Sequence, residues 1–413
     1  MRPRERRVTA GKLAQPRRHR PDYALVIISA ILMVIGLIVI YAISPGLSAS
    51  RGVSENYYIT KQLIAILLGV VAFGIMAFTP LNFWKRARTP LVAAAAIATL
   101  ITLITPVSEL YPAHRWIVVG GLSFQSVELV KFAMLFVVSA FLIERVRRGE
   151  LGDTQKTFKP LLIAVVVVGF IVAKLQSDLG SVAVMVAMLA TMAFVAGLPL
   201  RRIAIFGAII VAGATLLIVT SDYRRDRFAT YMNPERDCQT TGYQACQALI
   251  AVGSGGMFGK GLAQSVQAYG YLPEAANDSI FAIYAEKFGF LGVAALLALF
   301  VGFFSRLIRI MERAPDDMSR LIIAGILAWL STQAMINIGA MIGIFPLKGI
   351  TLPLISYGGT SIIFVAGIIG LAFNISRFTT FTPNTNITEG SPDDYRSNGR
   401  RDRRAYYAPL GRR

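Results

Sequence analysis

Charged residues are scarce in this chain of 413 residues: they make up 16% of it, against 55% for hydrophobic residues. A soluble domain of this size carries more charge, because it covers its core with a polar surface. The composition therefore excludes a soluble globular protein and indicates a polytopic membrane protein.

Acidic residues are fewer than basic ones, 23 against 42, which gives a net charge of +19. Such an excess is typical of proteins that bind nucleic acid, but here the Lys and Arg residues gather at the chain ends and in short turns between apolar runs. That distribution is the positive-inside pattern of membrane proteins. No nucleic-acid partner is predicted.

Cysteine is nearly absent, with only Cys238 and Cys246 lying eight residues apart in one polar loop. Two cysteines at this spacing do not predict a zinc site. A disulfide between them requires that the loop face an oxidising compartment. The alternative is two free thiols, with Cys246 directed into the helix bundle by a helix that begins near Thr241.

The apolar runs predict an all-α polytopic membrane protein with ten transmembrane helices. The first run, 23–43, is long enough to cross a hydrocarbon core of about 30 Å at about 1.5 Å per residue, so it is predicted to be a membrane span and not a cleavable signal peptide. The ten predicted spans are 23–43, 62–78, 90–105, 126–143, 160–173, 179–196, 203–220, 280–304, 321–344 and 360–375. Ten spans place both termini on one side, and the basic residues place that side in the cytoplasm.

The spans divide the chain into a membrane domain, 22–376, between two polar tails. The tails, 1–21 and 377–413, are predicted to be disordered and cytoplasmic. A large insert, 221–279, separates the seventh and eighth spans and is predicted to be extracellular. It is rich in glycine and carries acidic residues near the membrane edge, where ionisable groups are costly and usually functional. It is therefore the first candidate for a catalytic segment.

Ionisable residues also occur inside or beside the predicted spans. Glu128 and Lys131 are three residues apart, so they share a helix face and either form a structural ion pair or line a polar cavity. Asp178 stands at the start of a helix, where it is either a simple cap or a functional carboxylate.

Three arginines after the seventh span, Arg224, Arg225 and Arg227, are external by alternation and break the charge rule. Long loops escape that rule, which is one explanation. The other is that the arginines bind an anionic lipid head group, because a guanidinium can hold phosphate oxygens through two parallel hydrogen bonds.

Five motifs, spread from the third span to the tenth, give the chain a resemblance to the SEDS family of FtsW, RodA and SpoVE proteins. They lie at 115–131, 176–180, 253–262, 271–278 and 347–361. The last motif, in which LysGly precedes ThrLeuProLeuIleSerTyrGlyGly, resembles the division branch (FtsW) more than the elongation branch (RodA).

The resemblance implies a peptidoglycan glycosyltransferase of cell division that polymerises lipid II at the outer face of the bacterial cytoplasmic membrane. It implies three kinds of partner: a class B penicillin-binding protein of the FtsI type, other divisome membrane proteins, and lipid II as substrate. The family's catalytic aspartate falls on Asp278. Its substrate-binding positions fall on Glu128, Lys131, Asp178 and Ser356.

The chain departs from the family pattern at several positions. Where the family has His-Thr-Asp-Phe, this chain has Ala276, Asn277, Asp278 and Ser279, and the family prolines are replaced by Val127 and Ser177. Asp278 therefore lacks the His and Phe that flank it in the family.

The implied reaction needs one general base to deprotonate the attacking sugar hydroxyl, and a carboxylate in a dry site suits this role. The leaving group is a lipid diphosphate, so the remaining need is positive charge or a divalent cation, Mg²⁺ or Mn²⁺. Candidates to supply that charge are Arg224, Arg225, Arg227, Lys131 and Lys348. No cofactor is certain and no metal ligand is assigned. Two alternative functions stay open: a lipid II flippase and a catalytically silent divisome scaffold.

Overall fold

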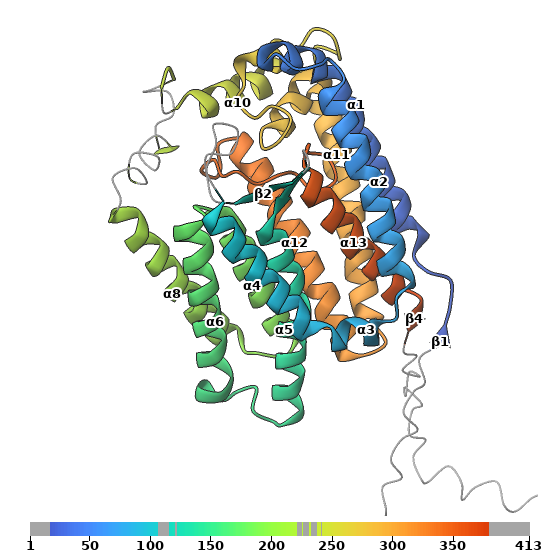
Figure 1. Ribbon diagram of the computed structural model, residues 1–413, viewed down its shortest axis with the longest axis vertical. Helices are drawn as coiled ribbons and strands as arrows, with labels where there is room; N and C mark the ends of the chain where they lie inside the picture. The colour runs from blue at the N-terminus through green and yellow to red at the C-terminus, as the bar shows by residue number, and fades with distance from the viewer. Residues whose placement is uncertain are drawn as a thin grey trace, which may run out of the picture.

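The computed structural model describes residues 17–105, 115–119, 122–220, 225, 231–232, 238–240 and 242–379. Helices dominate this part of the chain and form one bundle (Figure 1). The helices are α1 (Tyr23–Arg51), α2 (Tyr57–Phe78), α3 (Leu81–Arg86), α4 (Arg88–Ile104), α5 (Ser126–Arg147), η1 (Thr154–Phe158), α6 (Lys159–Phe170), η2 (Ile171–Leu175), α7 (Leu179–Val195), α8 (Leu200–Val219), α10 (Tyr243–Ser254), η4 (Gln267–Tyr271), α11 (Ile280–Glu312), α12 (Asp317–Met341) and α13 (Gly359–Ile375). The strands are β1 (Arg17–Arg18), β2 (Trp116–Val119), β3 (Leu122–Gln125) and β4 (Phe378–Thr379).

Each of the ten predicted apolar segments coincides with a helix. In the described residues, six helical stretches are long and apolar enough to cross a membrane. They are α1, α2, α5, the continuous run from η1 to η2, α11 and α12. The helices α4, α7 and α13 are apolar but shorter. The chain is therefore a multi-pass membrane protein.

The core of the bundle is built on α12 and α13, which lie at its centre in Figure 1. Helix α12 packs against α5, α7 and α11, and α13 packs along α2. A Cβ atom at Gly370 of α13 would lie 2.4 Å from the backbone oxygen of Phe73 in α2. Small residues at such contacts let two membrane helices approach closely, which is how their association gains packing energy.

The first helix is longer than the sequence predicts. It continues past Ile43 and through Pro45 to Arg51, where the sequence indicates a polar loop. A proline inside a membrane helix is tolerated when neighbouring groups satisfy the backbone. Here the Ser44 hydroxyl donates to the backbone oxygen of Glu55 at 2.6 Å and ties the helix end to the following turn.

A β-hairpin lies where the sequence predicts an irregular segment before the fourth span. Strands β2 and β3 pair antiparallel, with Trp116 opposite Gln125. The prediction of an all-α chain is therefore too simple at this place. Strands of only four residues are too short to show the apolar period that would reveal them in the sequence.

Helix α11 is broken at Gly289, although the sequence predicts one continuous span. Gly289 has φ 64° and ψ −166°, a conformation that is essentially restricted to glycine. The glycine-rich loop 253–262 lies against the break: the backbone N–H of Phe290 donates to the oxygen of Gly256 at 2.9 Å. In return, the N–H of Gly261 donates to the oxygen of Lys287 at 2.9 Å. The loop thus supplies hydrogen bonds that the broken helix cannot make.

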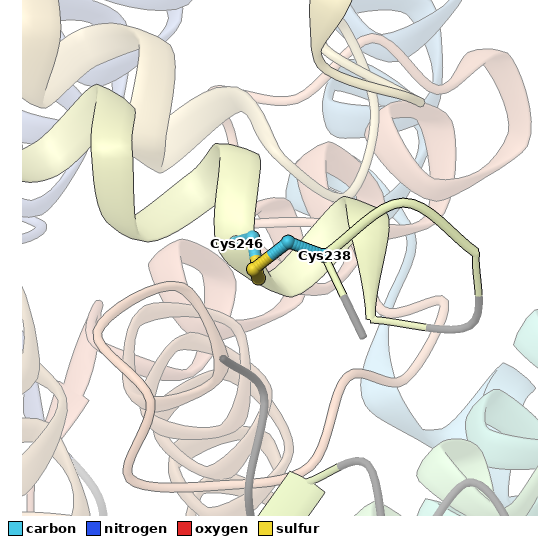
Figure 2. The surroundings of a disulfide bond; sticks show 2 residues. All are labelled: Cys238 and Cys246. Atoms are coloured by element: carbon cyan, nitrogen blue, oxygen red, sulfur yellow. A yellow bond between two sulfur atoms is a disulfide. The ribbon is translucent and has the colours of Figure 1, made fainter. Parts of the chain in front are cut away.

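The two tails contact one another. Strands β1 and β4 pair antiparallel, with Arg17 opposite Thr379, so two residues of each predicted tail are structured. At the opposite end of the bundle, Cys238 and Cys246 form a disulfide at the start of α10 (Figure 2). The bond attaches the segment that enters α10 to the helix itself.

Candidate functional site

A cavity of about 1450 Å³ opens between the helices near the end of the bundle that carries α10. Its walls come from α2, α5, α7, α13, the β2–β3 hairpin and two loops, 273–279 and 346–358. Nine charged side chains line it: Arg51, Lys61, Arg115, Glu128, Lys131, Asp178, Glu274, Asp278 and Lys348. Five of the residues predicted from the sequence are therefore brought to a single cavity.

The loop that carries Asp278 is held from below by α12. The Asn337 side chain donates to the backbone oxygens of Asp278 and Ile350, both at 2.7 Å. The Ser356 hydroxyl donates to the backbone oxygen of Asn277 at 2.7 Å. The loops 273–279 and 346–358 are thus fixed to one another, which positions the Asp278 carboxyl.

Hydrogen bonds also support the loop at two positions that depart from the family pattern, Ser279 in place of Phe and Asn277 in place of Thr. The Ser279 hydroxyl donates to the backbone oxygen of Pro273 at 2.9 Å and accepts from the Gln244 amide of α10 at 3.2 Å. The Asn277 amide donates to the Glu274 carboxylate. The departures from the family pattern therefore leave the loop supported by polar contacts instead of a ring.

The environment of Asp278 mixes burial with charges of both signs. The pKa of the Asp278 carboxyl is raised from 3.8 to about 7, mainly by burial and further by the Glu274 and Asp178 carboxylates, while Arg115 lowers it. A carboxyl with this pKa is an effective proton acceptor near neutral pH. The lack of a side chain at Gly349 makes room here, because a Cβ atom would lie 3.1 Å from Asp278 Oδ2 and 3.4 Å from Arg115 Nη1.

Arg115 is fixed by the loop that precedes α7. Its Nε donates to the backbone oxygen of Gln176 at 2.8 Å, and its Nη2 donates to that of Ser177 at 2.9 Å. Ser177 has φ 55°, unusual for a residue with a side chain. Arg115, from the motif 115–131, is therefore held near the Asp278 carboxyl group. The sequence alone does not reveal this arrangement.

Glu128 and Lys131 form a buried ion pair in α5, as their spacing predicts. Lys131 Nζ lies 2.8 Å from Glu128 Oε1, and both side chains are at most 4% exposed. The same nitrogen lies 4.6 Å from the centre of the Trp329 ring and donates to Gln333. The pair also lines the cavity. Glu128 and Lys131 therefore form a structural ion pair and line a cavity as well, which were the two alternatives drawn from the sequence.

Asp178 is a helix cap and a cavity residue at once. Its Oδ1 accepts from the backbone N–H of Ser181 at 3.0 Å, and its Oδ2 accepts from the Ser181 hydroxyl at 2.8 Å. Lys348 approaches the same helix start, since a Cβ atom on Gly180 would lie 3.3 Å from the Lys348 Cβ. Lys348 thus lies beside the N-terminus of α7, and a helix N-terminus favours anions.

Two other predicted substrate-binding residues, Ser356 and Arg225, do not line the cavity. Ser356 is buried beneath it and acts on the backbone of Asn277, so it positions the loop. Arg225 is exposed and is not a lining residue of the cavity. Arg224 and Arg227 lie outside the described residues.

Sequence reasoning missed the side chains that support the site. Asn337 and Gln333 are buried polar residues one turn apart in the apolar helix α12. Polar side chains at membrane depth usually serve a function, so the sequence did indicate that Asn337 and Gln333 have a role. Ser279 and Gln244 gave none, because both lie in the insert 221–279 or at its end, where polar residues are common.

The cavity can bind an anion and accept a proton. In the part of the chain that the structure describes, no three His, Cys, Asp or Glu side chains come together as a metal site. Arg115 and Lys348 are two cations of the cavity that could neutralise a phosphate. The fold and site define a multi-pass helical membrane protein with a polar cavity built around one carboxyl of raised pKa.

Comparison with known proteins identifies the family. The family model described as Cell cycle protein, which covers FtsW, RodA and SpoVE, matches residues 23–381, and the chain belongs to this family. It is 35% identical over 361 residues to the "Probable peptidoglycan glycosyltransferase FtsW" of Saccharophagus degradans, covering 86% of this chain and 92% of that one. It is also 35% identical to the Stage V sporulation protein E of Bacillus subtilis, covering 87% and 98%.

Solved structures show the same fold. One chain comes from a study of the structural coordination of polymerization and crosslinking by a peptidoglycan synthase complex, with a TM-score of 0.69 and 25% identity. That similarity covers 86% of this chain and 98% of the other. The rod shape determining protein RodA of Thermus thermophilus gives a TM-score of 0.63 at 25% identity, covering 86% and 97%.

Proposed function

We propose that this protein is a peptidoglycan glycosyltransferase of cell division that polymerises lipid II into glycan strands. The observation that carries the proposal is the position of Asp278, whose carboxyl has a pKa of about 7 and lines a cavity that also holds several cations. FtsW relatives at 30 to 35% identity carry the glycosyltransferase name.

The reaction joins two lipid-linked disaccharides. Asp278 accepts the proton of the attacking sugar hydroxyl, whose oxygen forms a bond to the anomeric carbon of the other sugar. The bond from that carbon to the lipid diphosphate breaks, and the diphosphate leaves with the electron pair. Lys348 and Arg115 stabilise the negative charge that develops on it, since fixed charges in a dry site act strongly. A divalent cation bound to the diphosphate would supply the same stabilisation.

The reaction takes place at the outer face of the bacterial cytoplasmic membrane. Ten spans, both termini in the cytoplasm and an extracellular insert of 221–279 are the topology that places the cavity there. The disulfide of Cys238 and Cys246 supports this orientation, because disulfides persist in oxidising compartments. So do the basic residues of the last turn of α5, Arg145 and Arg147, because α5 ends at the end of the bundle away from α10 (Figure 1).

The enzyme works with a class B penicillin-binding protein of the FtsI type and with other divisome membrane proteins. Support comes from the structural similarity to a chain of a synthase complex that coordinates polymerization with crosslinking. Crosslinking is a separate reaction, so a second protein must act on the glycan strand.

Substitution of the proposed base tests the function. Asp278→Asn keeps the size of the side chain but removes its basicity, so we expect polymerisation by the purified complex to fall by about two to four powers of ten. The measurement is glycan polymer formed from lipid II in detergent. The matched control is Asp317→Asn, an exposed carboxylate in the first turn of α12, which should leave the rate unchanged.

Each outcome separates the candidates. Polymer from the native protein and its loss in Asp278→Asn support the proposal. Near-normal polymer from Asp278→Asn overturns the assignment of the base. No polymer from the native complex overturns the enzyme itself and leaves the silent scaffold, or the flippase if lipid II crosses vesicle membranes.

A further inference from the structure

One face of α2 lines the cavity and does not carry Asp278, Arg115 or Lys348, the residues of the proposed reaction. The residues of this face are Tyr57, Lys61, Ala65 and Leu68. They are spaced by four, four and three positions, so they form one stripe along the helix. No step of the proposed reaction uses this stripe.

The stripe changes from polar to apolar along the helix. Tyr57 and Lys61 lie in its first turns, whereas Ala65 and Leu68 lie further along. Helix α13, which packs along α2, has the same order on its cavity side, with Thr360 before Phe364. Two walls with matching gradients suit a molecule with an anionic head and an apolar chain.

Lys61 can form an ion pair with an anion in the cavity. Its Nζ donates to the Tyr57 hydroxyl at 2.6 Å, and Lys61 belongs to none of the ion pairs among the described residues. Arg51 lies at the same rim, 3.6 Å from Glu274, with both side chains 44% exposed. Such an exposed pair is weak, so Arg51 can also turn toward an anion.

The cavity also holds the two cations of the proposed reaction, Lys348 and Arg115. Lys348 lies at the start of α7, and Arg115 contacts the loop before it. Asp278 and Glu274 belong to the loop 273–279, which lines the cavity together with both walls. Two cationic regions are thus present in one cavity with one proton acceptor.

We propose that the α2 stripe binds a second lipid diphosphate, with Lys61 on the diphosphate and with Ala65 and Leu68 along the first units of its chain. The inference rests on the proposed function, because glycan polymerisation joins two lipid-linked sugars and must hold two lipid diphosphates at once. It goes beyond that function by assigning one of them to α2.

Photo-crosslinking tests occupancy without relying on activity. The probe is radiolabelled geranylgeranyl diphosphate, a lipid diphosphate without sugars, added to the full-length protein in phospholipid vesicles. Replacement of Leu68 by p-benzoylphenylalanine should give a labelled product. Replacement of Leu67, which is 65% exposed on another face of α2, should give only background labelling. Adding Lys61→Met to the Leu68 variant should remove most of the label.

Competition defines the ligand. Excess unlabelled geranylgeranyl diphosphate should abolish the label, and geranylgeraniol, which has the chain without the diphosphate, should not. Equal labelling at the two positions, labelling that survives Lys61→Met, or equal competition by the alcohol would show an ordinary lipid contact and overturn the proposal. Equal competition by inorganic diphosphate would overturn the role of the apolar half.

Kinetics separate this inference from the proposed function. Lys61→Met should raise the KM for lipid II about tenfold with kcat within about threefold, and Lys61→Arg should recover most of the loss. The control is Lys159→Met at the exposed start of α6, which does not line the cavity. If Lys61→Met polymerises with native KM while Asp278→Asn is inactive, the α2 site is wrong and the enzyme assignment stands. If the native protein makes no polymer, the enzyme assignment fails.

Discussion

At the scale of the residue, the properties of Asp278 depend on groups that are distant in the sequence as well as on the nearby Glu274. Its backbone is held by Asn337, its position is fixed through Ser356, and Arg115 and Glu274 act on its charge. The motif 271–278 identifies the Asp278 carboxyl as a candidate from the sequence alone. Its pKa cannot be predicted from the sequence, because it depends on how three loops fold over the cavity.

The pH dependence of polymerisation should report this pKa. Asp278 accepts a proton only when ionised, so with a pKa of about 7 the kcat should rise as the pH increases through neutrality. At one pH unit below the pKa only about a tenth of the carboxyl is ionised, and kcat should fall about tenfold. Rates at saturating lipid II between pH 5.5 and 8.5 measure it.

Glu274→Gln offers an internal check on that profile. It removes a carboxylate that raises the pKa of Asp278, so the midpoint of the profile should move to lower pH. A flat profile above pH 5.5 in the native enzyme would contradict the raised pKa.

The pair of Glu128 and Lys131 should respond to substitution as a unit. Their side chains are 2.8 Å apart and nearly fully buried, so removal of one leaves an uncompensated charge that costs about 3 to 5 kcal/mol. Glu128→Gln and Lys131→Met should each lower the folded yield or the polymerisation rate. The exchange Glu128→Lys with Lys131→Glu should recover part of the loss. Normal folding and activity of both single variants would show that the pair is dispensable.

At the scale of the element, the sequence predicts the helices well and their interruptions poorly. Runs of apolar residues long enough to cross a membrane locate α1, α2, α5, α11 and α12 directly. The break in α11 escapes such reasoning because residues 280–304 are apolar apart from Glu286 and Lys287 and contain no proline. What determines the break is the loop 253–262, which is distant enough that no local pattern connects the two.

Gly289→Ala should therefore destabilise the protein out of proportion to its size. The new Cβ atom would lie 2.3 Å from the backbone nitrogen of Gly259, at a φ of 64° that side chains rarely adopt. We expect the free energy of unfolding to fall by about 1 to 3 kcal/mol or more. The measurement is thermal unfolding in detergent, whose midpoint should be lower than that of the native protein.

The control is Gly213→Ala in α8, where a Cβ atom meets nothing within 4 Å. This change should be neutral or slightly stabilising, because alanine favours helices. An unfolding midpoint of Gly289→Ala equal to that of the native protein would show that the break can close into a regular helix.

At the scale of the whole molecule, the bundle has two unlike ends. The strands β1 and β4 and the ion pair of Arg306 with Asp22, 2.6 Å, lie at one end. The disulfide and α10 lie at the other (Figure 1). The distribution of Lys and Arg predicts on which side of the membrane each end lies, and this prediction needs no tertiary structure.

The orientation can be measured with a protease. An epitope tag placed after Arg413 should be removed by trypsin in inside-out vesicles and protected in intact spheroplasts. Trypsin cleaves after Lys and Arg, which the C-terminal tail offers in number. Loss of the tag from intact spheroplasts would place the tail outside and reverse the proposed topology.

The contact between β1 and β4 also bears on how the chain could be rearranged. Arg17 and Thr379 are paired across two strands, so their Cα atoms lie about 4.5 to 5.5 Å apart. A short linker in place of the tails could join them into a closed ring, and the ring could be opened again in the turn 148–153 after α5. A circular permutant made in this way would begin in that turn and pass through α13 into α1, while every helix and the cavity between them stayed where they are.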